Sequence, residues 1–265
     1  MIVALRSALY IGWLFVTAAS WAVVVLSASV FVRGLPLYRM CAAWCTFAIW
    51  GARVICGVRW RVSGMDNLPP ASDRDAAVVL VSKHQSTWET CAYPMLMPHP
   101  LAFVFKRELL LIPFFGWGLS RLDMIRIDRS RRTEAWSRVL AQGRQLMARG
   151  TWVIMFPEGT RIARGQVGDY KRGAAKLAIA SKVDLVPIAV TSARCWPRRS
   201  FVLVPGVIDI SIGPPIRTQG RRSDELMTEA REWIEAEMRR LDPQAYAADS
   251  GSPAEAGAGV TASGS

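Results

Sequence analysis

Two long apolar stretches open the chain. The first, residues 7–32, has 26 uncharged residues in succession and as a helix would extend about 39 Å, enough to cross a hydrocarbon core of about 30 Å with some tilt. The second, residues 40–58, contains Arg53 and follows Arg39, so it is a poor spanning segment and a better interfacial or re-entrant partner for the first. Together they predict a membrane-associated helical hairpin over residues 1–56.

A cleaved signal peptide is the alternative for the first stretch, because small residues occur at positions 27–29. The stretch is far longer than the apolar region of a signal peptide, which has about 7–15 residues, and only Arg6 precedes it. More arginines follow it, namely Arg33, Arg39, Arg53, Arg59 and Arg61. By the positive-inside rule we expect the main domain on the cytoplasmic face of a bacterial-type inner membrane, whether the hairpin spans or is re-entrant.

After the hairpin, short apolar runs alternate with amphipathic segments, which is typical of α/β architecture. Strands are predicted at 58–62, 76–81, 101–105, 124–127, 151–156, 185–190 and 207–212. Helices are predicted at 87–96, at 130–149 and at 223–241, the last with acidic residues in its first turn and arginines in its last. The main domain is therefore expected at 57–241. Residues 242–265 are mostly Ala, Gly, Ser and Pro, which predicts a disordered tail.

Composition narrows the possible functions. The chain has 265 residues, of which 51% are hydrophobic, enough for one α/β core and an anchor. Its formal charge of +12 would attract nucleic acid, an anionic membrane or an acidic substrate. Nucleic acid ranks last because zinc-ligand spacing, RNP-type aromatic runs and basic heptads are missing from the sequence. The five cysteines form no CxxC pair, so we expect reduced cysteines and no metal site.

A histidine and a carboxylate follow the uncharged run at 76–81, and they are His84 and Glu89. Five positions on a regular helix would leave these side chains well apart in angle, so His84 is predicted in the turn, with Glu89 on the following helix reaching back to it. Glu89 would then accept a hydrogen bond from one ring nitrogen of His84 and leave the other nitrogen free to act as a base. Pro157 to Arg161 follow the run at 151–156, which suggests one site shared by two strand ends.

The sequence places no protein nucleophile beside this base. Ser86 lacks the G-x-S-x-G elbow that would expose it, and Cys91 falls in a helical run. The attacking group is therefore expected to be a hydroxyl of the substrate. The other histidine, His99, lies between two prolines and is expected to be structural.

At these residues the chain resembles the glycerolipid acyltransferases, and within them the 1-acylglycerol-3-phosphate (lysophosphatidic acid) acyltransferases. Four motifs match in order between residues 84 and 188. They are the H-x4-D motif at 84–89, a second from Lys106 through Pro113 and Gly116 to Arg129, F-P-E-G-T-R at 156–161, and V-P-I at 186–188. Glu89 stands where the family usually has Asp. The role of a carboxylate survives an extra methylene, although the histidine orientation must adjust, and related lipid A acyltransferases have Glu there.

The resemblance implies a mixed central sheet flanked by helices, and acyl transfer from acyl-CoA or acyl-ACP to the sn-2 hydroxyl of lysophosphatidic acid, giving phosphatidic acid. His84 would be the general base and Glu89 its orienting partner. Lys106 and Arg161 would bind the phosphate, Gly159 would let the backbone approach, and Glu158 would hydrogen-bond the glycerol. The full substrate-binding set is Lys106, Arg126, Glu158, Gly159, Thr160 and Arg161, in which Arg126 is a weaker candidate that could instead contact solvent or anionic headgroups.

The resemblance implies neither metal nor bound cofactor, and membrane lipids are the other expected partners. Within the same superfamily, the acceptor could instead be glycerol-3-phosphate, a lyso-ornithine lipid or a lipid A precursor. In a different class, a non-catalytic lipid-binding membrane protein could keep the fold. Loss of the usual Asp at position 89 is the one feature that favours this second class.

Overall fold

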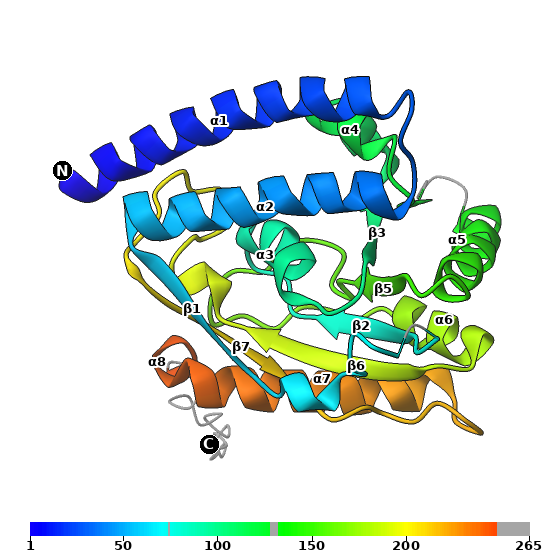
Figure 1. Ribbon diagram of the computed structural model, residues 1–265. Coiled ribbons are helices and arrows are strands. Elements are labelled where there is room, and N and C mark those ends of the chain that lie inside the picture. The colour runs from blue at the N-terminus through cyan, green and yellow to red at the C-terminus, as the bar shows by residue number, and fades with distance from the viewer. Residues whose placement is uncertain (74, 128–131, 248–265) are drawn as a thin grey trace, which may run out of the picture.

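The computed structural model describes residues 1–73, 75–127 and 132–247. It confirms the N-terminal helical hairpin, made of α1 (Ile2–Ala28) and α2 (Leu35–Cys56), which lie side by side along one face of the domain (Figure 1). The two helices approach closely at Gly51, where a Cβ would lie 2.3 Å from the ring of Trp13. Trp21 Nε1 donates to the carbonyl of Met40 at 3.0 Å. Small residues and indole hydrogen bonds thus fix the pairing of two apolar helices.

Helix α1 is attached to the domain at its N-terminal end. Arg6 Nε donates to the carbonyl of Ile55 at 2.5 Å, and the Ser7 hydroxyl accepts from Leu203 N at 2.9 Å. Tyr10 is buried in the core, with its ring 6.0 Å from that of Trp196. At its other end α1 packs against α4 (Phe115–Leu119). The helix therefore runs along the domain for its whole length.

The domain is built on one sheet. Within the described residues this sheet has seven strands in the order β1-β7-β6-β2-β5-β3-β4. All neighbours are parallel except β6 and β7, so the sheet is mixed, as expected. The strand bounds are β1 Val58–Ser63, β2 Val78–Ser82, β3 Leu101–Lys106, β4 Ile125–Ile127, β5 Trp152–Met155, β6 Asp184–Val190 and β7 Gly206–Ile212. Central strands β2 and β6 are almost wholly buried, which explains their uninterrupted apolar sequences.

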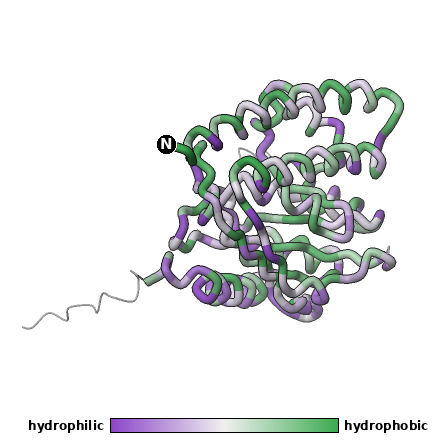
Figure 2. The backbone as a smooth tube through the Cα atoms, turned by 60° about the vertical axis from the view of Figure 1, so that its left-hand side comes forward, coloured by the Kyte–Doolittle hydropathy of each residue, from purple (hydrophilic) through white to green (hydrophobic). Residues whose placement is uncertain are grey.

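Helices cover both faces of the sheet. Val78 and Leu80 of β2 pack on the side of the hairpin and of α3 (Trp88–Leu96), whereas Val79 and Val81 pack on the opposite side, against α5 (Arg132–Met147), α6 (Gly173–Ser181) and α7 (Ser223–Leu241). Figure 2 shows hydrophilic residues gathered along α7, the helix at the bottom of Figure 1. The remaining helices are α8 Pro243–Tyr246 and the 3-10 helices Met65–Asn67, Arg107–Leu111 and Ser192–Arg194.

The predicted disordered tail is wrong at its beginning. Asp242 accepts hydrogen bonds from Arg164 Nε and Nη2, both at 2.8 Å, and pairs with Arg194 at 3.3 Å. Tyr246 is buried against the core that α7 helps to form. Two arginine partners and one aromatic ring thus hold residues 242–247 against the domain, despite their low apolar content. The rest of the predicted tail, 248–265, lies outside the described residues.

Candidate active site

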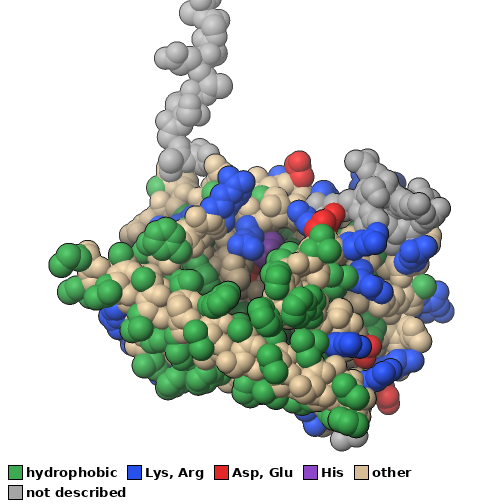
Figure 3. Space-filling model, turned by 90° about the horizontal axis from the view of Figure 1, so that it is seen from above, with side chains coloured by type: hydrophobic (Ala, Val, Ile, Leu, Met, Phe, Trp, Pro, Cys, Tyr) green, Lys and Arg blue, Asp and Glu red, His purple; other side chains and the backbone are tan. Residues whose placement is uncertain are grey.

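The ends of two adjacent strands bring the predicted site together. Val81 of β2 is in register with Met155 of β5, and the chain continues from these strands to His84 and to Phe156. The two side chains stack, with ring centroids 3.9 Å apart and an interplanar angle of 18°. Seen from the hairpin side, a histidine lies at the bottom of a hollow rimmed by hydrophobic side chains and by Lys or Arg (Figure 3).

His84 and Glu89 are joined as predicted, with His84 in the turn and Glu89 in the first turn of α3. Nδ1 of His84 lies 2.5 Å from Oε2 of Glu89. The other carboxylate oxygen, Oε1, accepts from the backbone N–H of Gln85 at 2.9 Å, from that of Ser86 at 2.8 Å and from the hydroxyl of Ser192. The Glu89 side chain is fully buried, whereas that of His84 is 14% exposed. Because Nδ1–H donates a hydrogen bond to the carboxylate, the neutral imidazole has its free lone pair on Nε2.

The turn between Pro157 and Arg161 holds the backbone of His84. Glu158 Oε2 accepts from His84 N at 3.0 Å, and Ile162 N donates to His84 O at 2.7 Å. Gly159 has a φ of +67°, which a residue with a side chain adopts only at a cost, so glycine allows this turn to close on the histidine. The F-P-E-G-T-R motif therefore contacts the ring and the N–H of His84, and Ile162, the residue after the motif, binds its carbonyl.

Glu158 itself does not face the substrate side, which corrects the role predicted for it. Its side chain is fully buried, and Oε1 lies 2.8 Å from Lys83 Nζ. Lys83 also pairs with Glu235 of α7 at 2.7 Å, and the hydroxyl of Tyr170 donates to the same Glu235 oxygen at 2.8 Å. Burial raises the pKa of Glu158, and the adjacent Lys83 ammonium opposes that rise. Glu158 is thus part of a buried ion cluster beneath His84.

The predicted phosphate-binding residues fall in different places. Arg161 is exposed at the N-terminal end of α3, where its Nη1 donates to Thr87 Oγ1 at 2.8 Å, and Thr160 beside it is exposed. Arg126 is in register with Phe105, on the sheet face that carries Phe103 and Phe156. Lys106 is in register with Ile127, which packs on the opposite face. By this placement Arg126, rather than Lys106, shares a face with His84.

Four groups of this site were not predicted from the sequence: Lys83, Glu235, Tyr170 and Ser192. Helical spacing gave only a partial signal for Glu235, because it lies at the edge of the apolar stripe of α7, beside Met238 but on the opposite side of the helix from Leu226. No local signal pointed to Ser192, which contacts Glu89 across 103 residues of sequence. His99 lies apart from this cluster, stacked on Trp152 with Nε2 3.1 Å from the carbonyl of Pro70.

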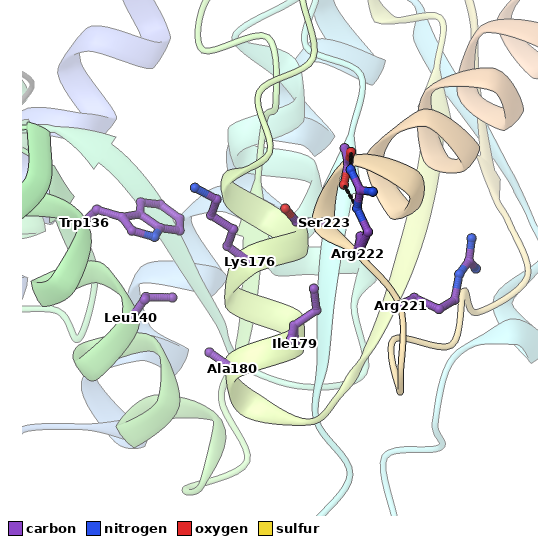
Figure 4. A pocket seen from close by; sticks show the side chains of 9 residues that line it. Trp136, Leu140, Lys176, Ile179, Ala180, Arg221, Arg222 and Ser223 are labelled. Carbon is purple, nitrogen blue, oxygen red and sulfur yellow. Dashed lines mark hydrogen bonds and ion pairs between the residues drawn. The ribbon is translucent and has the colours of Figure 1, made fainter.

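A separate hollow of about 450 Å³ lies between α5, α6 and the beginning of α7 (Figure 4). Its floor is apolar, with Trp136, Leu140 and Ile179, and its rim carries Lys176, Arg221 and Arg222. Arg222 is paired with Asp224 and Arg221 with Glu229. This hollow contains none of the predicted site residues, and it lies on the sheet face away from His84. In the described part of the chain, no group of three or more His, Cys, Asp or Glu side chains is arranged to hold a metal ion, and metal independence stays a prediction.

Comparison with known proteins gives consistent matches. Residues 59–191 match the family model described as Acyltransferase. The chain is 40% identical over 234 residues to the 1-acyl-sn-glycerol-3-phosphate acyltransferase of Pseudomonas aeruginosa, covering 82% of this chain and 89% of that protein. It is 31% identical over 177 residues to the human 1-acyl-sn-glycerol-3-phosphate acyltransferase alpha, covering 66% and 60%. The crystal structure of the LPA acyltransferase PlsC from Thermotoga maritima has the same fold, with a TM-score of 0.73 at 22% identity over 90% of this chain and 95% of that one.

Proposed function

Because the chain belongs to the acyltransferase family, we propose that it transfers a fatty acyl group from a thioester to the sn-2 hydroxyl of lysophosphatidic acid, producing phosphatidic acid. The observation that carries the proposal is the His84–Glu89 pair, in which the carboxylate is buried and fully hydrogen-bonded while the imidazole reaches a hollow with an apolar rim. A base at the edge of an apolar surface suits an acceptor whose acyl chain stays in lipid. The donor is acyl-CoA or acyl-ACP as co-substrate, and the reaction uses no bound cofactor.

His84 removes the proton of the acceptor hydroxyl through Nε2 while the oxygen attacks the thioester carbonyl. The tetrahedral intermediate then collapses, the C–S bond breaks, and the imidazolium returns its proton to the departing thiolate. Glu89 holds the ring in the required tautomer and stabilises the imidazolium through the 2.5 Å contact. Phe156 limits the tilt of the ring from one side. Atoms balance without a protein nucleophile, because one ester bond replaces one thioester bond.

The phosphate of the acceptor is bound by two exposed arginines on the side of the sheet that carries the pair. Arg161 stands at the N-terminal end of α3, and Arg126 stands on the same sheet face as His84. A guanidinium matches the geometry of a phosphate and forms two parallel hydrogen bonds to it. Lys106 contributes less, because its position in the register turns it to the other face.

Arg161→Ala is expected to raise the KM for lysophosphatidic acid by about 10- to 100-fold, because hydrogen bonds to charged groups contribute about 1.5–3 kcal/mol. Arg126→Ala should raise this KM more than Lys106→Ala does, and the KM for the acyl donor should change little in all three. Arg231→Ala, an exposed arginine on α7 at the other side of the sheet, is the control. Steady-state kinetics in mixed micelles with varied acceptor measures these values, and an unchanged KM in Arg161→Ala would remove it from the phosphate site.

The N-terminal hairpin attaches the enzyme to the membrane. In the described chain, α1 is the one helix with the length and composition to cross a bilayer, and only 11% of its apolar window is buried. Its exposed hydrophobic side chains include Leu5, Leu9, Phe15 and Val23, and Leu111 and Trp117 extend the apolar surface beyond it. The contacts of both ends of α1 with the domain support a helix that lies in one leaflet without crossing it. The arginines around the hairpin support a location of the domain on the cytoplasmic face of the inner membrane.

This placement predicts that a tag on the N-terminus is accessible from the same side of the membrane as the domain. In proteoliposomes sorted for outward-facing domains, a membrane-impermeant protease should remove the N-terminal tag completely. A tag placed at the C-terminus serves as the control for orientation. Protection of the N-terminal tag alone would show that α1 spans the bilayer.

The proposed reaction is tested with purified protein in mixed micelles, with palmitoyl-CoA or acyl-ACP as donor. The acceptors are lysophosphatidic acid, glycerol-3-phosphate, a lyso-ornithine lipid and a lipid A precursor. Phosphatidic acid from lysophosphatidic acid is expected to form fastest. Product from another acceptor alone would move the chain to a related O-acyltransferase activity. Binding of lipids with no product from any acceptor would favour a non-catalytic lipid-binding protein.

A further inference from the structure

We propose that Ser192 is a positioning residue for acyl transfer, which acts by fixing the carboxylate of Glu89 against His84; the proposal rests on the proposed function. The hydroxyl of Ser192 donates to Glu89 Oε1, and the residue is fully buried. It comes from outside the four motifs that carry the family resemblance, the last of which ends at Ile188. Ser192 touches no reacting atom, because Glu89 and the imidazole of His84 stand between it and Nε2.

The segment that carries Ser192 is held in place independently of Glu89. Ser192 begins the 3-10 helix that follows β6, the strand beside β2. Thr191 N donates to the carbonyl of Asp209 at 3.0 Å, and Asp209 N donates to Thr191 Oγ1 at 2.9 Å. Arg194 pairs with the carboxylate of Asp209 at 3.1 Å. Strand β7 therefore fixes the position of the Ser192 hydroxyl. Because the serine is held without help from Glu89, its hydrogen bond can orient the Glu89 carboxylate.

The direction of the hydrogen bond is determined by its partner. An ionised carboxylate only accepts, so the hydroxyl of Ser192 must donate. Together with the N–H groups of Gln85 and Ser86, it provides three donors to Oε1 from three separate chain positions. Oε1 has no capacity left for His84, and Oε2 alone faces Nδ1. The carboxylate can neither exchange its two oxygens nor rotate without losing buried hydrogen bonds, which is costly.

Such a constraint matters more in this chain because position 89 is Glu. A glutamate has one more rotatable bond than the aspartate usual in the family, so its carboxylate would otherwise sample more orientations and hold the imidazole less well. The two backbone N–H groups come from the same turn as His84 and move with it. Ser192 is the donor that ties the carboxylate to a separate segment, the one that follows the neighbouring strand β6. The hydroxyl of Ser192 thus restricts the additional rotational freedom that the longer side chain of Glu89 brings.

Ser192→Ala is expected to lower kcat about 10- to 100-fold, the effect of losing a hydrogen bond to a charged group, with the KM for acceptor and donor within about twofold of wild type. Ser192→Cys, which keeps the size and a weaker donor, should have an intermediate kcat. Ser181→Ala is the matched control: Ser181 Oγ is buried at the end of α6 with no hydrogen-bond partner among the described residues, so its loss should leave kcat unchanged.

A double-mutant cycle separates positioning from simple structural support. If Ser192 acts through the Glu89 carboxylate, Ser192→Ala should change kcat by less than about twofold in a Glu89→Ala background. An equal loss in both backgrounds, or wild-type kcat in Ser192→Ala, would overturn the proposal. If Ser192→Ala does not fold, as judged by thermal melting, the same cycle is run with Ser192→Cys. The cycle uses whichever acceptor the wild type acylates, so a wrong acceptor assignment and a wrong role for Ser192 give different results.

Discussion

We expect His84→Ala to lower kcat for phosphatidic acid formation by about 10³-fold or more, with little change in the KM of either substrate. General-base catalysis contributes about 10²- to 10⁴-fold, and the other groups beside the hollow cannot replace the imidazole. Glu89 is fully buried behind the ring, Ser86 is buried, and the guanidinium of Arg161 has N–H donors but no acceptor. The acceptor hydroxyl would have to attack without losing its proton first.

His99→Ala is the matched control for this variant. It removes the other histidine of the chain, which stacks on Trp152 away from the site. Its kcat should stay within about threefold of wild type, and circular dichroism should show that both variants fold. Glu89→Gln should lose about 10⁴-fold, because its amide oxygen must take the place of Oε1 opposite three donors, and its NH₂ group then faces Nδ1 and holds the ring in the wrong tautomer. Substantial turnover in folded His84→Ala would exclude the base mechanism, whatever the acceptor.

Lys83→Met is expected to reduce the free energy of unfolding by about 3–5 kcal/mol at neutral pH. Among the residues that the structure describes, Lys83 is the one cation in contact with both buried carboxylates, Glu158 at 2.8 Å and Glu235 at 2.7 Å. Removing it leaves two acidic groups without their counter-charge in a dry environment, which costs more than the original pair contributed. Arg240→Met, which removes an exposed pair with Glu237, is the control and should change stability by less than about 1 kcal/mol.

The loss in Lys83→Met should become smaller as the pH falls. Burial already raises the pKa of Glu158 in the wild type, and removal of Lys83 removes the largest effect that opposes this rise. A carboxyl whose pKa is raised by folding gains stability from protonation, so its contribution is complete below the unfolded pKa and is lost as the pH rises through the folded one. Urea unfolding between about pH 4.5 and 8 measures this dependence. A destabilisation that is constant across that range would show that the carboxylates do not carry the effect.

Local pattern was enough to predict most of the fold. Each of the seven predicted strands overlaps an observed one. The buried central strands appear as short uninterrupted apolar runs, whereas β1 alternates apolar and polar residues because one of its faces is exposed. Helix α7 begins and ends as predicted, since charges at both of its ends complement the helix dipole. Helix α6 was not predicted, because Gly173–Ser181 is short and apolar on most sides and has no polar face that would give a helical period.

The site was predictable only where it is local. His84 and Glu89 lie five positions apart, so their geometry follows from one turn and one helix start. Glu235 and Ser192 reach the same site across 152 and 103 residues, a proximity that depends on strand order and not on any local motif. The sequence could not show which way the side chain of Glu158 points. A side chain just after a strand can point into the core or toward solvent, and its direction depends on packing against residues distant in sequence, here Lys83.

The most direct test of the account is the position of the transferred acyl group. Purified wild-type protein is given palmitoyl-CoA with a labelled acyl chain and unlabelled 1-oleoyl lysophosphatidic acid in mixed micelles, and the product is cleaved with a phospholipase specific for the sn-2 ester. The account predicts labelled phosphatidic acid with all of its label released from sn-2, one CoA freed for each phosphatidic acid, and no CoA released without acceptor. Label at another position, or CoA released with no phosphatidic acid formed, would contradict it.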